Sequence, residues 1–257
     1  MSNFDRNYAP FSGVASDRAV AYDMGLRAHM LRVYNYMTGG VALTGAIAWL
    51  TFQAAGGDAI RVVGRSITGL TPFGHAVFAN PLLLLLLALA PLGVGYFIIF
   101  RIGQLQASTA RLLFFVYAGT IGLSLATIFM VFTTTSITQV FFISAAAFGA
   151  LSLYGYTTQR SLDAMGSFLT MGLFGLFIAM VVNIFLGSSM LQWLVSVAGV
   201  GIFAGLTAWN TQTIKELYDP MDDGTVAGRK AVMGALQLYI DFIAMFQFLL
   251  QLLGDRR

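Results

Sequence analysis

A single acidic side chain lies inside the long apolar stretches of this sequence, and it is the residue best suited to carry chemistry. Ten of the eleven Asp and Glu residues fall in the N-terminal segment, the expected loops or the tail, whereas Asp241 lies in the middle of an apolar run. A carboxylate at the centre of a bilayer costs about 2.5–3.5 kcal/mol on insertion scales, so it must face other helices or a wet cavity. We therefore expect Asp241 to be either a proton- or cation-responsive site or a protonated acid that holds helices together by hydrogen bonds.

The neighbours of Asp241 on an α-helix form a distinctive face. Helical spacing places Gly234, Gln237, Met245 and Phe248 on the same side of the helix as Asp241. Along this face a small residue, Gly234, is followed by an amide, Gln237, and then by the acid Asp241. We expect this face to point at the other helices, which makes Gln237 a second candidate site residue.

The composition argues against several other kinds of chemistry. The chain has no Cys, which excludes thiolate catalysis and Cys-ligated zinc. Its two histidines, His29 and His75, and its two lysines, Lys215 and Lys230, all lie outside the expected membrane spans. A two-histidine metal site, a Ser–His dyad and a retinal Schiff base within the membrane therefore have no support. We predict no enzyme activity, no catalytic residue, no bound metal and no cofactor.

The elements that position Asp241 must be membrane helices. Of 257 residues, 58% are hydrophobic and only 10% are charged, with a mean hydropathy of +0.78. A soluble domain has about 25% charged residues, so this chain could not cover its own surface in water and must sit in a lipid bilayer. The net charge of +3 is attributed to Arg residues that flank membrane helices, and nucleic acid is not an expected partner.

The apolar runs predict an all-α polytopic membrane protein with seven transmembrane helices. Each run is long enough to cross a hydrocarbon core of about 30 Å, the fourth only with its polar ends included. The expected spans are residues 33–52, 81–100, 112–132, 140–156, 168–186, 191–209 and 231–253. Six consecutive leucines at 82–87 are incompatible with the alternating pattern of a membrane β-barrel.

The Lys and Arg residues set the expected orientation. With seven spans, ten of them fall on one side of the membrane and four on the other. The first group is Arg6, Arg18, Arg27, Arg32, Arg101, Arg111, Arg160, Lys215, Arg229 and Lys230, and the second is Arg61, Arg65, Arg256 and Arg257. The positive-inside rule makes the first side, with the N-terminus, cytoplasmic and puts the C-terminus on the opposite side of the membrane. A last segment that re-enters and returns to the cytoplasm is the alternative, because Arg256 and Arg257 fit an exported end poorly.

Residues 1–32 are expected to form a cytoplasmic N-terminal segment, followed by one membrane domain at 33–257. From Val14 to Arg32, apolar and charged residues alternate in a pattern that fits an amphipathic helix on the membrane surface. The alternative interpretation is a soluble lead-in to the first span.

Three stretches of the chain resemble the Bax inhibitor-1 family of membrane proteins. They are SITQVFFISAAAFGALSLYGYT at 136–157, FAGLTAWNTQTIK at 203–215 and ALQLYIDFIAMF at 235–246. The three occur in the order found in the family, and the segment at 154–157 resembles bacterial members, which implies a bacterial inner membrane.

The resemblance implies a seven-helix bundle whose last helix is central, and a pH-sensitive passive leak of Ca²⁺. In the family the sensor is a pair of aspartates, of which the second aligns with Asp241 and the first with Asn210. Because an amide is neutral at every pH, the coupled pair cannot form here. Either the natural protein has lost the sensor or an engineered replacement accounts for Asn210. An Arg near the end of the second helix acts as a latch in the family, and Arg101 is the candidate for it.

A second function implied by the resemblance is regulation without transport. Bacterial relatives are associated with a membrane-anchored ATP-dependent protease. In this interpretation the polar N-terminus and the helix at 14–32 contact the protease or another membrane complex.

Overall fold

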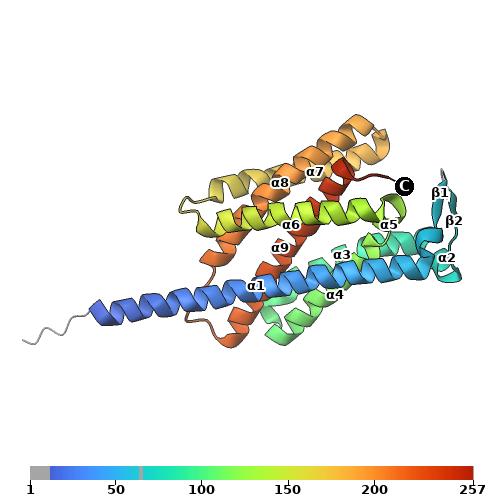
Figure 1. Ribbon diagram of the computed structural model, residues 1–257. Helices are drawn as coiled ribbons and strands as arrows, with labels where there is room; N and C mark the ends of the chain where they lie inside the picture. Colours follow the sequence, from blue (N-terminus) through green and yellow to red (C-terminus); the bar gives the residue numbers. More distant parts are fainter. Residues whose placement is uncertain (1–11, 64–65, 257) are drawn as a thin grey trace, which may run out of the picture.

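The protein is an elongated bundle of helices (Figure 1), seen here in a computed structural model that describes residues 12–63 and 66–256. The helices are α1 (Ser12–Ala55), α2 (Pro72–Phe78), α3 (Pro81–Arg101), α4 (Ala107–Leu125), α5 (Ile128–Val131), α6 (Thr134–Thr157), α7 (Asp163–Leu186), α8 (Ser189–Glu216) and α9 (Gly224–Leu253). Two 3₁₀ turns, η1 (Gly57–Ala59) and η2 (Ile102–Gln104), and two short strands complete the described elements.

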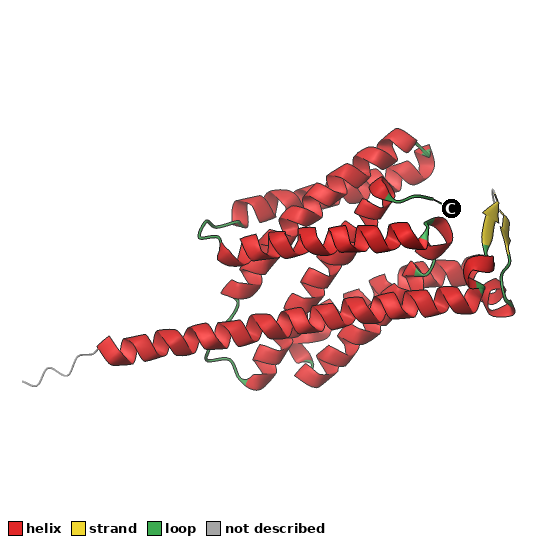
Figure 2. Cartoon of the chain, in the orientation of Figure 1, coloured by secondary structure: helices red, strands yellow, loops and turns green. Residues whose placement is uncertain are grey.

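The long helices run back and forth between two ends of the bundle (Figure 1). We call the end that holds the loop between α8 and α9 the α8–α9 end. The opposite end, which holds α5, the strands and the C-terminus, is called the hairpin end (Figure 2). There β1 (Arg61–Val63) pairs antiparallel with β2 (Ser66–Thr68), which the sequence analysis did not anticipate.

Six helices of the described chain are long and apolar enough to cross a membrane. They are α3 with η2, α4 with α5, α6, α7, α8 and α9, and they coincide with the last six expected spans, of which the span at 112–132 ends one residue beyond α5. The expected first span, residues 33–52, lies within α1, which is not among the six. That stretch contains three threonines and three glycines, which make it less apolar than the others.

The last helix is the centre of the bundle. Helix α9 contacts α8, α1, α6 and α4 (Figure 1). In its most apolar stretch 56% of the residues are buried, against 33% or less in the other five candidate spans. The prediction of a central last helix is confirmed.

The most apolar helices lie on the outside, as expected when lipid replaces water as the solvent. Helices α3 and α7 lead the six in hydropathy, yet only 11% and 6% of their apolar stretches are buried. Phe185 on α7 is 85% exposed, and Phe168 and Phe174 are also exposed. A continuous apolar surface of this kind is typical of a membrane protein.

Helix α1 extends across the expected boundary at residue 32 between an N-terminal segment and a membrane domain. The helix continues unbroken through Arg32, so the expected surface helix and the expected first span form one element. No proline interrupts it, and one of its faces packs on α4 and α9 through Met30, Val33, Met37 and Thr44. The remainder of the expected segment, residues 1–11, lies outside the described residues, as do Arg65 and Arg257.

Helix α9 also runs without a break, which bears on the alternative of a re-entrant last segment. It begins at the α8–α9 end and finishes at the hairpin end. There the Thr133 amide donates to the Asp255 carbonyl at 3.0 Å, and the Asp255 amide donates to Ser136 Oγ at 2.9 Å. The helix therefore traverses the bundle once and does not turn back.

Several glycines allow the helices to approach closely. A Cβ at Gly199 would lie 2.6 Å from the Phe248 ring, and one at Gly205 would lie 2.4 Å from Leu169. Both glycines therefore allow close helix packing. At Gly201 and Gly175, by contrast, a Cβ would meet nothing within 4 Å, so close approach does not require glycine there.

The loop between α8 and α9 docks on α1 through Tyr218. Its ring lies 5.3 Å from the Tyr22 ring and 5.6 Å from the His29 ring, in space left by Gly25. His29 is buried, and its Nε2 has no hydrogen-bond partner. Burial lowers the pKa of His29 below its ordinary value of 6.5, and the nearby positive charge of Arg32 lowers the pKa further. The charge of Lys230 acts in the same direction and that of Asp222 opposes it.

This histidine predicts a loss of stability in acid. As the pH falls below about 6.5, the unfolded chain binds a proton at His29 before the folded chain does, so the folded state loses stability. We expect the thermal unfolding midpoint to fall between pH 8 and pH 5.5, and to fall less in His29→Gln. The exposed His75 supplies the control, because His75→Gln should keep the full decrease. Equal decreases in the native protein and His29→Gln would contradict the prediction.

Candidate functional site

Asp241 is buried in the central helix and is held by an amide of the neighbouring helix. Its side chain is 3% exposed, and Asn210 Nδ2 on α8 donates a hydrogen bond of 2.7 Å to its Oδ2 atom. The two residues singled out from the sequence are therefore in direct contact. Asn210 itself is half-buried.

The face of α9 that carries Asp241 packs against α8, as the helical spacing predicted. A Cβ on Gly234 would lie 3.0 Å from Ile214, and the Phe248 ring stacks 5.9 Å from the Phe203 ring. The contact at Gly234 lies before Asp241 along α9, and the contact at Phe248 lies after it. These contacts fix the rotation of α9, so the carboxyl group must point at α8.

The other two candidate residues do not join the pair. Gln237 is half-buried on α9 and makes no hydrogen bond among the described residues. Arg101 is exposed at the end of α3, where its Nη1 donates to Gln104 Oε1 at 3.1 Å. Helix α3 packs on α4 and α2 at the edge of the bundle, so the structure does not bring the expected latch to Asp241 or Asn210.

A chain of hydroxyl groups beside the pair was missed by the sequence analysis. Tyr34 Oη on α1 lies 2.6 Å from Ser152 Oγ on α6, which lies 3.0 Å from Thr211 Oγ1 on α8. Because Thr211 donates its proton to the Thr207 carbonyl at 2.8 Å, Ser152 donates to Thr211 and Tyr34 donates to Ser152. Hydroxyl residues inside apolar spans were the available signal, because they commonly bond across helices.

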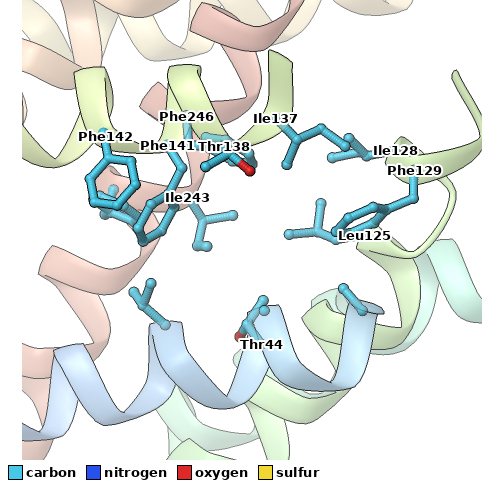
Figure 3. Close-up of a pocket in the computed structure, with 14 residues that line it drawn as sticks. Thr44, Leu125, Ile128, Phe129, Ile137, Thr138, Phe141, Phe142, Ile243 and Phe246 are labelled. Carbon is cyan, nitrogen blue, oxygen red and sulfur yellow. The ribbon is translucent and has the colours of Figure 1, made fainter. Parts of the chain in front are cut away.

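An apolar cavity lies between α9 and the helices α1 and α6 (Figure 3). It has a volume of about 340 Å³ and is lined by α1, α4, α5, α6 and α9. Phe242 and Ile243, which follow Asp241, line the cavity, whereas Asp241 does not. Its two hydroxyl groups already have partners: Thr44 is bonded to Tyr239 Oη at 2.6 Å and to the Ala118 carbonyl at 2.8 Å, and Thr138 donates to the Thr134 carbonyl at 3.0 Å. The other residues that line the cavity are apolar, so it is poorly suited to a cation.

The surroundings of Asp241 define what it can do chemically. Lys230 forms an ion pair with Asp222 at 2.5 Å, whereas Asp241 forms no ion pair with a described residue and so has no protein cation beside it. The Asn210 amide stabilises the carboxylate by one hydrogen bond but leaves its charge uncompensated. A buried charge of this kind is neutralised by binding either a proton or a cation.

The fold and site together define a polytopic helical membrane protein with an acid–amide pair between its central helix and a neighbour. A family model described as "Inhibitor of apoptosis-promoting Bax1" matches residues 26–257. The chain belongs to this family, the Bax inhibitor-1 family, as its sequence motifs indicated.

Bacterial relatives support the assignment over nearly the whole chain. Inner membrane protein YbhL of Escherichia coli is 38% identical, with 94% of this chain and 97% of YbhL covered. Protein RP147 of Rickettsia prowazekii is 41% identical over 92% of this chain and 93% of its own length. A protein of Caulobacter vibrioides is 40% identical, with both chains fully covered.

Proposed function

We propose that this protein is a passive cation pathway across the membrane, with Ca²⁺ as the ion and Asp241 as the titrating group that controls it. The observation that carries the proposal is the burial of Asp241 in the central helix without a protein cation beside it. A carboxylate there binds either a proton or a cation, so the two compete for the same group.

The membership of the Bax inhibitor-1 family supports this function, because the sequence resemblance implies a pH-sensitive Ca²⁺ leak. This chain differs from the family pattern at Asn210, where the family has an aspartate. One carboxyl group titrates here in place of two, so the pH response is that of a single site.

The proposed topology has seven spans, with α1 as the first. Helix α1 runs the length of the bundle beside α4 and α9, and its 44 residues extend about 66 Å, which exceeds the thickness of a bilayer. The N-terminus then lies in the cytoplasm and the C-terminus in the periplasm. The name of the relative YbhL supports a location in a bacterial inner membrane.

Replacing the acid tests the proposal directly. Purified protein is reconstituted into liposomes that contain a Ca²⁺-sensitive dye, and the flux is measured from pH 8 to pH 5.5. Asp241→Asn should change the flux and remove its dependence on pH, because an amide does not titrate. Asp219→Asn, which alters an exposed carboxylate of the α8–α9 loop, is the matched control and should behave like the native protein. If Asp241→Asn gives the native flux and the native pH profile, the proposal fails.

A specific feature of α1 favours the alternative function, regulation of a membrane complex. The N-terminal part of α1 projects beyond the other helices (Figure 1), and further along the helix Met24 and Leu31 are 68% and 52% exposed. A projecting helix with exposed apolar residues offers a surface to a partner such as a membrane-anchored protease. Crosslinking in native membranes separates the two functions, because a stoichiometric partner together with no Ca²⁺ flux in liposomes supports regulation.

A further inference from the structure

A second cavity opens between α1 and α6 near the α8–α9 end. Its volume is about 450 Å³. Met30 of α1 and Phe148 of α6 are buried at its base, and the Phe148 ring packs 5.6 Å from Phe242 of the central helix. Leu31 and Leu153, which also line it, are 52% and 63% exposed. The cavity is therefore open sideways, toward the surface where lipid chains lie.

The depth of this cavity depends on a glycine. Gly149 lies on its wall, and a Cβ built there would meet nothing within 4 Å. Tyr34 of α1 and Ser152 of α6 also line the cavity, and the hydrogen bond between their hydroxyl groups joins the two helices there. From Arg27 to Tyr34 the site extends seven residues along α1, or about 10 Å. This length matches the upper part of one lipid chain.

The mouth of the cavity carries positive charge. Arg27 lines it and is exposed, and it forms no ion pair within the described residues, although Asp23 lies one turn earlier on α1. Tyr156 lines the same mouth, and Lys215 Nζ lies 5.3 Å from the centre of its ring while donating to its carbonyl at 2.9 Å. An apolar cavity between membrane helices that ends in an arginine without an ion-pair partner is suited to a lipid with an anionic headgroup.

We propose that the cavity between α1 and α6 is a binding site for an anionic glycerophospholipid, with one acyl chain against Phe148 and Gly149 and the phosphate on Arg27. An arginine binds a phosphate through a charge-assisted pair of hydrogen bonds, and the Tyr156 hydroxyl is a further donor at the mouth. The site is separate from the Asp241–Asn210 pair and does not depend on the transport proposal.

Native mass spectrometry of the full-length protein in detergent tests this site. The probes are dioleoyl phosphatidylglycerol, dioleoyl phosphatidylcholine and, as a free phosphate source, glycerol 3-phosphate. The native protein should bind one phosphatidylglycerol in preference to phosphatidylcholine, and glycerol 3-phosphate should not displace it. Arg27→Gln should weaken phosphatidylglycerol binding about tenfold, to the level of phosphatidylcholine. Gly149→Leu should abolish the binding of both lipids, because the new side chain fills the cavity.

Matched variants control for charge and for volume. Arg32→Gln removes an exposed cation five residues along α1, and Gly175→Leu fills open space on α7, so both should bind lipid as the native protein does. The proposal is overturned if Gly149→Leu retains its affinity, if Arg27→Gln retains the preference for phosphatidylglycerol, or if glycerol 3-phosphate displaces the lipid. Should Gly149→Leu fail to fold, the Arg27→Gln result decides alone.

Discussion

Asn210→Asp is expected to extend the pH dependence of Ca²⁺ flux through this protein over a wider range of pH. The Asn210 amide lies 2.7 Å from Asp241 Oδ2, so the substitution would place two carboxyl groups at hydrogen-bonding distance. Like charges this close cannot both ionise, and the pair must share a proton and titrate in two steps. A single site changes its ionised population at most about tenfold per pH unit, whereas two coupled sites respond over a wider range of pH.

The measurement is the ratio of liposome Ca²⁺ flux at pH 8 to that at pH 5.5. We expect the ratio in Asn210→Asp to differ from the native ratio by about tenfold, the effect of one added proton-binding step. Gln106→Glu adds an acid at an exposed position of the loop between α3 and α4, and it should leave the ratio unchanged. Superimposable titration curves for Asn210→Asp and the native protein would exclude a coupled pair at this position.

Gly155→Ala is expected to destabilise the bundle severely for a change of one methyl group. The new Cβ would lie 2.1 Å from the Ala208 carbonyl oxygen and 3.0 Å from the Ala208 Cα atom. These are backbone atoms, so α6 and α8 would have to separate. The hydrogen bond between Ser152 and Thr211, one turn away, would lengthen as well. Overpacking of this kind costs about 1–3 kcal/mol.

The matched control lies on the same helix and should change stability in the opposite direction. Gly149→Ala adds the same atom where nothing lies within 4 Å, so the greater helix propensity of alanine should stabilise the protein by about 0.5–1 kcal/mol. Both changes are measured as shifts in unfolding in mixed detergent micelles. Stabilisation by both substitutions would show that α6 and α8 are not in close contact at Gly155.

The candidate site was predicted to different degrees at its different residues. Asp241 was found because its charge conflicts with the apolar run around it, and Asn210 because of its place in a family motif. The contact between them is confirmed. Arg101 could not be placed in the same way, because its position in space depends on how α3 packs, and α3 lies at the edge of the bundle. The hydroxyl chain through Ser152 was missed because serine is common in membrane helices and carries no periodic signal.

The amino-acid sequence alone was sufficient to establish that this protein lies in a lipid bilayer and where its membrane helices lie along the chain. Hydrophobic runs, the absence of interrupting charges and one misplaced acid are local properties, and they are readable without coordinates. The packing of α9 among its neighbours, the unbroken course of α1 through Arg32 and the open space beside Gly149 come from contacts between residues far apart in sequence. The parts of the helices that lie in lipid are mostly apolar on all sides, so side-chain fit and hydrogen bonds between helices, and not hydrophobicity, decide which faces meet.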